Sequence, residues 1–150
     1  MQTFASLCQA FCALQGLPVP EVNTGRDGLQ AFTLDVGHCG LTVLHDARAL
    51  PRTLFLVAEL GRPGSPGAEL QGWRALLQAN YWLRSDNPPT FSRNPQTGEA
   101  VFQWTLPFID TSAVRLHEAV TTMTRLVRCW ALPEGAAATP PPGPWLGAFA

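Results

Sequence analysis

The chain has 150 residues, of which 46% are hydrophobic, so it can bury the core of one domain and lacks the composition of a disordered chain. Ten arginines and no lysine stand against eleven acidic residues, and the net charge of −1 disfavours nucleic acid as a partner. The absence of lysine also excludes a Schiff-base lysine and a P-loop lysine.

The first half of the chain predicts one helix followed by three strands. In residues 3–15 apolar side chains recur at intervals of three and four, and Gly16 ends this amphipathic pattern. The strand-like runs are residues 30–36, 41–46 and 52–60. Their short connections favour an antiparallel meander. The third run is apolar on both faces, so we expect it to be covered on both sides or to lie in an interface.

The second half predicts a helix, a hairpin and a last helix. The second helix runs from residue 68 to about 83, and the hairpin strands are residues 90–93 and 99–106. The last helix begins near residue 113, and its candidate N-caps are Asp110, Thr111 and Ser112. The order α-β-β-β-α-β-β-α predicts an α+β fold with helices packed on a twisted antiparallel sheet. Residues 1–132 form this domain, and residues 133–150 are an Ala- and Pro-rich tail that we expect to be flexible.

No targeting or membrane-spanning segment is visible in the sequence. No stretch approaches the ~20 consecutive apolar residues of a transmembrane helix, and the first residues lack the positive charge of a signal peptide. We therefore expect a cytoplasmic protein without a membrane span.

The four cysteines have no metal-binding or redox spacing. They are Cys8, Cys12, Cys39 and Cys129, and none of them forms a CxxC pair. The simplest interpretation is that they are buried thiols that pack as small hydrophobes. The alternative is a small thiol or metal enzyme, whose candidate residues are Cys8, Cys12, Cys39, His38 and His45. Because no HExxH, GxSxG, GxGxxG or P-loop motif accompanies them, we expect no enzymatic activity, no cofactor and no metal.

Apolar side chains are more numerous than a small two-layer core requires. The chain has five tryptophans and eight phenylalanines, and the second helix carries apolar residues on more than one face. Large exposed apolar patches on soluble proteins usually mark protein-binding surfaces. This surplus therefore favours a binding function.

The second helix also carries a family signature. The segment Leu76-Leu77-Gln78-Ala79-Asn80-Tyr81-Trp82 resembles the LLxxN motif of class I type III secretion chaperones, the Tir-chaperone (CesT-like) family. The hairpin and the last helix follow it in the order found in that family. The resemblance covers residues 1–132 and leaves the tail outside.

The resemblance implies a homodimer whose second helices and neighbouring strand surface pack about a two-fold axis. A two-fold contact requires a self-complementary patch. The interface candidates that the resemblance gives are Trp73, Leu77, Asn80, Tyr81, Trp82, Val101, Gln103 and Thr105.

The resemblance also implies a client, the unfolded N-terminal segment of a secreted effector protein, which is bound in extended form and kept competent for export. Such a segment can add a strand to the sheet and place side chains in apolar pockets. The effector-binding candidates are Phe4, Leu7, Phe11, Phe32, Leu34 and Leu54. The ATPase of the secretion system is a further implied partner. The alternative function is an α+β regulatory or protein-binding module unrelated to secretion.

Overall fold

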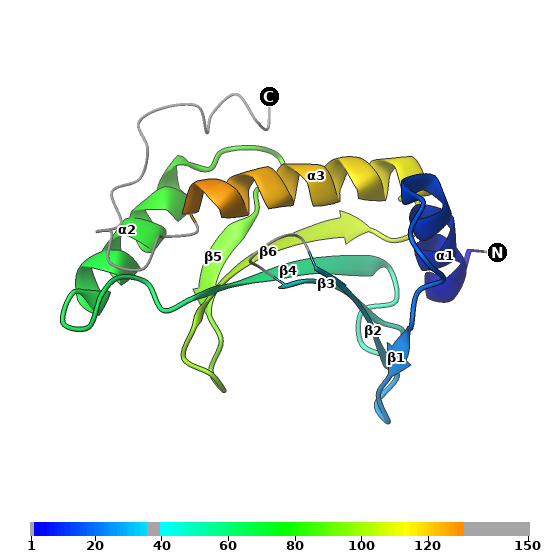
Figure 1. Cartoon of the computed structure of the whole chain (residues 1–150), viewed down its shortest axis with the longest axis horizontal. Coiled ribbons are helices and arrows are strands. Elements are labelled where there is room, and N and C mark those ends of the chain that lie inside the picture. The colour runs from blue at the N-terminus through cyan, green and yellow to red at the C-terminus, as the bar shows by residue number, and fades with distance from the viewer. Residues whose placement is uncertain (1, 36–39, 131–150) are drawn as a thin grey trace.

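A computed structural model describes residues 2–35 and 40–130 of the chain, and these residues form three helices and six strands (Figure 1). The helices are α1 (Phe4–Gln15), α2 (Glu69–Trp82) and α3 (Ala113–Trp130). The strands are β1 (Asn23–Thr24), β2 (Leu29–Asp35), β3 (Gly40–Asp46), β4 (Thr53–Gly61), β5 (Thr90–Arg93) and β6 (Ala100–Pro107).

The strands form one antiparallel sheet in the order β1-β2-β3-β4-β6-β5. This arrangement confirms the predicted α+β fold, and β2, β3 and β4 form the predicted meander. Strand β1 was not predicted from the sequence, because a strand of two residues is too short to show an alternating pattern. Most of the predicted turn at residues 37–40 lies outside the described residues. The whole predicted tail at residues 133–150 also lies outside them.

Helix α1 is fixed by both of its caps and by one apolar face. The Thr3 side chain accepts a hydrogen bond from the Ser6 amide, and the Thr3 amide donates to the Ser6 hydroxyl. Gly16 ends the helix in the left-handed conformation, with φ of 65°. The buried face of α1 consists of Phe4, Leu7, Cys8, Phe11 and Cys12.

Helix α3 lies on the same side of the sheet as α1 (Figure 1). Of the three predicted N-caps, Ser112 performs this role, because its hydroxyl accepts a hydrogen bond from the Arg115 amide. Thr111 is instead buried and donates its hydroxyl hydrogen to the Pro107 carbonyl. The buried side chains of α3 are Leu116, Ala119, Val120, Met123, Leu126 and Val127.

Strand β4 is covered on one face only. Leu54, Leu56 and Ala58 are fully buried beneath the helices. On the opposite face Phe55 and Val57 are partly buried, and no described helix lies over them (Figure 1). The described residues therefore cover one face of β4, and the apolar side chains on its other face remain candidates for an interface.

Helix α2 stands at the far end of the sheet, beside β5 (Figure 1). Its buried Gly72 lies so close to the Pro63 carbonyl that an added Cβ would collide with it, which explains a glycine in the middle of a helix. Leu76 and Leu83 complete its contact with the core. None of the described helices is long and apolar enough to cross a bilayer.

Candidate functional site

Helix α2 exposes a continuous row of large apolar side chains. The exposed fractions are 63% for Leu70, 65% for Leu77, 64% for Tyr81 and 60% for Trp82. Leu70, Leu77 and Tyr81 are separated by seven and four residues and so share one helix face. We call these four residues the α2 apolar surface. Exposed apolar rows of this kind on soluble proteins usually bind another protein.

The other predicted interface residues are less exposed to solvent or are bonded within the chain. Trp73 is partly buried against the core, and the Asn80 side chain is bonded to β5. Gln103 and Thr105 are partly buried on the uncovered face of the sheet. Val101 has only 7% of its surface exposed, so the chain itself already buries it.

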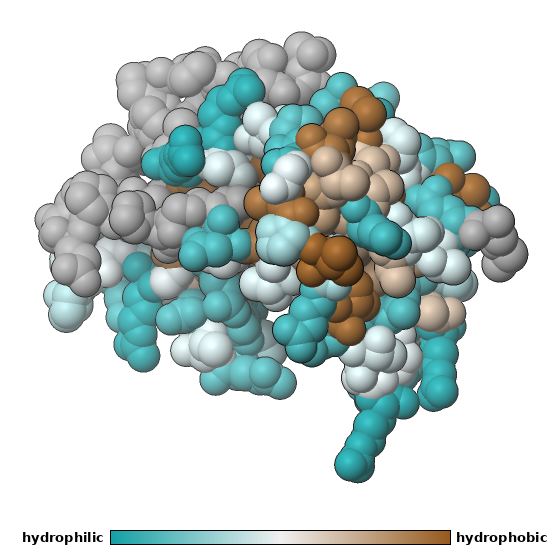
Figure 2. Space-filling model, turned by 45° about the vertical axis from the view of Figure 1, so that its right-hand side comes forward, coloured by the Kyte–Doolittle hydropathy of each residue, from teal (hydrophilic) through white to brown (hydrophobic). Residues whose placement is uncertain are grey.

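A pocket of about 520 Å³ opens between α1, α3 and the end of β2. Phe11, Leu17, Leu34 and Val120 supply its apolar lining. Leu17 is 44% exposed and carries this lining out to the surface. The molecular face that bears α1 shows brown and tan atoms gathered in its middle (Figure 2). The pocket therefore has an exposed apolar residue in its lining and can accept apolar side chains from a partner.

Basic side chains of α3 line one side of the same pocket. His117, Arg125 and Arg128 of α3 line it on one side, and Asp35 of β2 is the acidic lining residue. Within residues 2–35 and 40–130 neither arginine forms a salt bridge with a carboxylate. Among the described residues no carboxylate pairs with these two arginines, so the pocket offers positive charge to a partner although the chain as a whole is close to neutral.

The six predicted effector-binding side chains lie in the core of the chain. Their exposed fractions do not exceed 9%, and they are Phe4, Leu7, Phe11, Phe32, Leu34 and Leu54. Only Phe11 and Leu34 also line the pocket. The other four can touch a client only if α1 leaves the sheet, so their effector contact stays a prediction.

The edge of the sheet beside the pocket is incompletely paired. Strand β1 pairs with Gln30 and Ala31 of β2 and with no further residue. Within the described part of the chain, residues 32–35 of β2 therefore have no strand beside them on that side. An exposed strand edge of this kind can pair with another extended segment.

Sequence reasoning named only Phe11 and Leu34 of the pocket residues and missed Gln15, Leu17, Asp35, His117, Val120, Thr121, Thr124, Arg125 and Arg128. Val120, Thr124 and Arg128 stand four residues apart along α3, so the sequence does place them on one face. Nothing in the sequence joins this face to Leu17 or to the end of β2. That juxtaposition arises only from the packing of the three elements.

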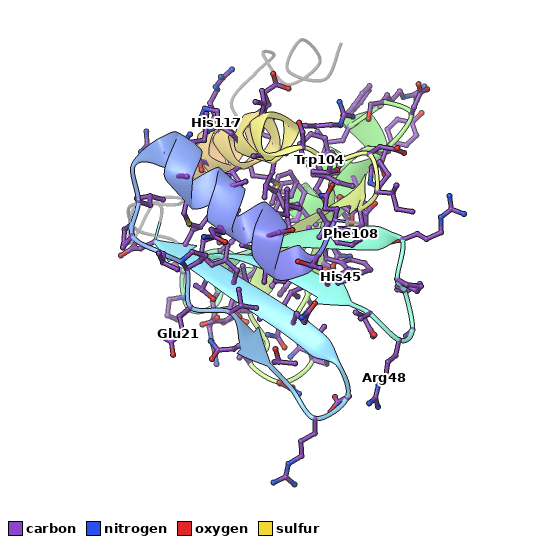
Figure 3. All side chains as sticks on the ribbon, turned by 90° about the vertical axis from the view of Figure 1, so that its right-hand side faces the viewer. Glu21, His45, Arg48, Trp104, Phe108 and His117 are labelled. Carbon is purple, nitrogen blue, oxygen red and sulfur yellow. The ribbon has the colours of Figure 1, made fainter. Side chains whose placement is uncertain are left out.

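His45 is buried and satisfied within the chain. Its Nε2 lies 3.1 Å from the Pro51 carbonyl oxygen, and its Nδ1 lies 3.3 Å from Oε1 of Gln30. Its ring packs between Phe4 and Phe108, with ring centroids 5.7 Å and 4.2 Å away. Figure 3 shows His45 and Phe108 close together, while His117 lies near the other end of α1. Because both ring nitrogens have partners, His45 has a structural role and is not a free metal ligand.

The two described cysteines lie inside the core. Burial raises the pKa of the Cys8 thiol to about 12, and the neighbouring Cys12 contributes to the rise. Burial also raises the pKa of Cys12. A nucleophilic or metal-binding cysteine needs its thiolate form, which this environment disfavours. Cys39 and His38, and the Cys129 side chain, lie outside the described part.

Alkaline pH should therefore destabilise the fold through Cys8. Its folded pKa exceeds the ordinary value of 9.0, so the stabilisation is complete below pH 9 and is lost as pH rises towards 12. The free energy of unfolding should fall by roughly 1.4 kcal/mol per pH unit in this window. Urea titrations at several pH values would measure it, and Cys8→Ala should remove this part of the pH dependence. An equal alkaline loss in the variant would contradict the assignment.

Comparison with known proteins supports the fold. No protein-family model matches the sequence, and no curated protein sequence matches it either. Among solved structures, a chain from the complex of the Yersinia pestis type III secretion chaperone SycH with a stable fragment of YscM2 aligns with a TM-score of 0.59 at 20% identity. The alignment covers 84% of this chain and 98% of that chain.

Two further complexes have chains of the same shape. A chain of the ExsC–ExsE complex aligns with a TM-score of 0.64 at 19% identity, covering 87% of this chain and 95% of that chain. A chain of the ExoT–SpcS complex from Pseudomonas aeruginosa aligns with a TM-score of 0.53 at 22% identity, covering 83% and 92%. The protein therefore shares its fold with chains of these three complexes, one of which contains a type III secretion chaperone.

Proposed function

We propose that the protein is a type III secretion chaperone of the class I kind, which holds the N-terminal segment of a secreted effector and has no enzymatic activity. The carrying observation is that part of the β2 edge, which no strand of the described residues pairs with, lies next to the apolar pocket. A strand edge and a pocket side by side suit an extended segment better than a folded surface. The shared fold and the LLxxN resemblance support the same function.

In this proposal the effector segment adds a strand beside residues 32–35 of β2. Main-chain hydrogen bonds would supply affinity without regard to sequence, and alternate side chains would enter the pocket beside Leu34. Arg125 and Arg128 would favour a segment with acidic side chains near its apolar ones. Bound in this way the segment stays extended and competent for export, and no nucleotide is needed.

A homodimer completes the proposal. The α2 apolar surface of one chain would pack against that of a second copy, because a two-fold axis brings identical patches together. The proposed interface region also includes the residues that border or support this surface, which are Trp73, Asn80, Gln103, Thr105 and Val101. The proposal places the protein in the cytoplasm, where effectors await export, with the ATPase of the secretion system as a further partner.

Co-expression with the N-terminal segments of candidate effectors tests the proposal. We expect one or more segments to co-purify with the chain, and each of these segments to show the circular dichroism of an unfolded peptide when it is free. Leu17→Ser should weaken this binding roughly tenfold or more, because Leu17 lines the pocket.

Val19→Ser is the matched control. Val19 is 80% exposed and lies two residues away, but it does not line the pocket, so its replacement should leave binding unchanged. Equal effects of the two substitutions would remove the pocket from the binding site. Selective binding of a folded partner, with no unfolded segment retained, would instead identify a regulatory module.

A further inference from the structure

The edge of the sheet formed by β5 differs from the edge formed by β2. The Asn80 side chain on α2 donates a hydrogen bond from its Nδ2 to the Phe91 carbonyl, at 2.9 Å. Its Oδ1 accepts a hydrogen bond from the Phe91 amide, at 2.7 Å. One amide side chain thus binds both main-chain polar groups of the central part of β5.

These two Phe91 groups are the ones that another strand would use. In an antiparallel pair, successive residues direct their N–H and C=O alternately towards the partner and away from it. Phe91 lies opposite Phe102 of β6, and its N–H and C=O point to Asn80 rather than to β6. The N–H and C=O groups of Thr90 and Ser92 therefore point to β6, and those of Phe91 point away from β6, to the outer edge of the sheet. The Asn80 amide occupies that edge as a peptide group of an added strand would.

Within residues 2–35 and 40–130, no side chain is seen to cover the opposite edge in this way. The Leu29 carbonyl accepts a hydrogen bond from the Gly25 amide, which shows that Leu29 faces the β1 side. By the same alternation Ala31 and Thr33 also face that side. Ala31 lies opposite Asn23 of β1, whereas the strand pairing ends before Thr33. Thr33 therefore presents its main chain at an edge where, in the described part of the chain, no strand pairs with it.

We propose that Asn80 closes the β5 edge to strand addition and thereby directs an extended partner segment to the β2 edge beside the pocket. The occupant is the effector segment, and this part of the inference rests on the proposed function. The asparagine amide supplies both the donor and the acceptor that these two hydrogen bonds need. Aspartate lacks the donor and leucine lacks both groups. Edge strands left unprotected pair with other chains, so closure at β5 also prevents unwanted sheet extension.

Self-association of a variant tests the closure without any client. In the full chain carrying Leu77→Asp, which removes the proposed α2 contact, we would add Asn80→Ala. At low protein concentration, the Phe91 amide hydrogen of this double variant should exchange with solvent roughly tenfold or more faster than the same hydrogen in the Leu77→Asp chain. At high concentration the mass by sedimentation velocity should rise and the Phe91 amide should become protected again. Gln78→Ala, on an exposed residue of the same helix, should change neither quantity.

A rise in mass without renewed Phe91 protection, or an unchanged mass at every concentration, would overturn the closure. If the Asn80→Ala variant does not fold, amide hydrogen exchange in the unsubstituted chain tests which edge of the sheet an effector segment joins. When an effector segment binds, the Thr33 amide should gain roughly tenfold or more protection and the Phe91 amide should not change. Protection gained in β5 would overturn the inference. Binding that protects neither amide would overturn it too, while leaving the chaperone function intact.

Discussion

Replacing Leu77 by aspartate should convert the dimer into a folded monomer. Leu77 is 65% exposed at the centre of the α2 apolar surface. In a two-fold interface the substitution acts twice, removing two apolar contacts and bringing two carboxylates together without a partner. The dissociation constant of the dimer should rise by roughly a hundredfold or more. The fold should survive, because exposed positions change stability by only about 0.5 kcal/mol.

The measurement compares light-scattering mass and circular dichroism of the two chains at equal concentration. Gln78→Asp is the matched control, since it adds the same charge at the neighbouring exposed position of the same helix. It should leave the dimer intact. A Leu77→Asp chain that is still a dimer would move the interface away from the α2 apolar surface.

Phe11→Ala should cause the largest loss of stability. Phe11 is 2% exposed and packs edge-to-face on Phe32, with ring centroids 6.2 Å apart. Truncation would enlarge the pocket into the core, at a cost of about 3–5 kcal/mol. Urea-induced unfolding, followed by circular dichroism, would measure it. Leu14→Ala, on the exposed side of the same helix at 50% exposure, should cost less than about 1 kcal/mol.

This pair of variants also separates two roles for Phe11. A loss of effector binding by Phe11→Ala at unchanged stability would show that Phe11 contacts the client directly. A loss of stability comparable with that of other core truncations would show that Phe11 supports the pocket from within. The structure favours the second result, because the Phe11 ring on the buried face of α1 packs against Phe32 of the sheet.

Local sequence signals predicted the secondary structure well. The predicted end of α1 at Gly16 and the cap of α3 at Ser112, one of three candidates, follow from glycine conformational freedom and side-chain hydrogen bonding, which depend on a few neighbouring residues. The alternation in β2 likewise follows from strand geometry alone. Strand β1 was missed because only its pairing with Gln30 and Ala31 defines it.

The candidate site was predicted less well, because periodicity does not identify what covers a side chain. The stripe that includes Phe4 and Leu7 shows that these side chains point the same way, but the sheet and α3 bury them before any client can. The row on α2 has the same periodicity, and Leu77 and Tyr81 are exposed. Only the packing of the whole chain distinguishes these two faces.

The central claim is that two chains meet through the α2 apolar surface to form one effector-binding unit. The most direct test is the solution mass of the purified full chain by light scattering. A mass near twice 16.2 kDa, independent of salt, is the predicted result. A stable monomer of 16.2 kDa at high protein concentration would contradict the claim and would leave the exposed residues of α2 for a different partner.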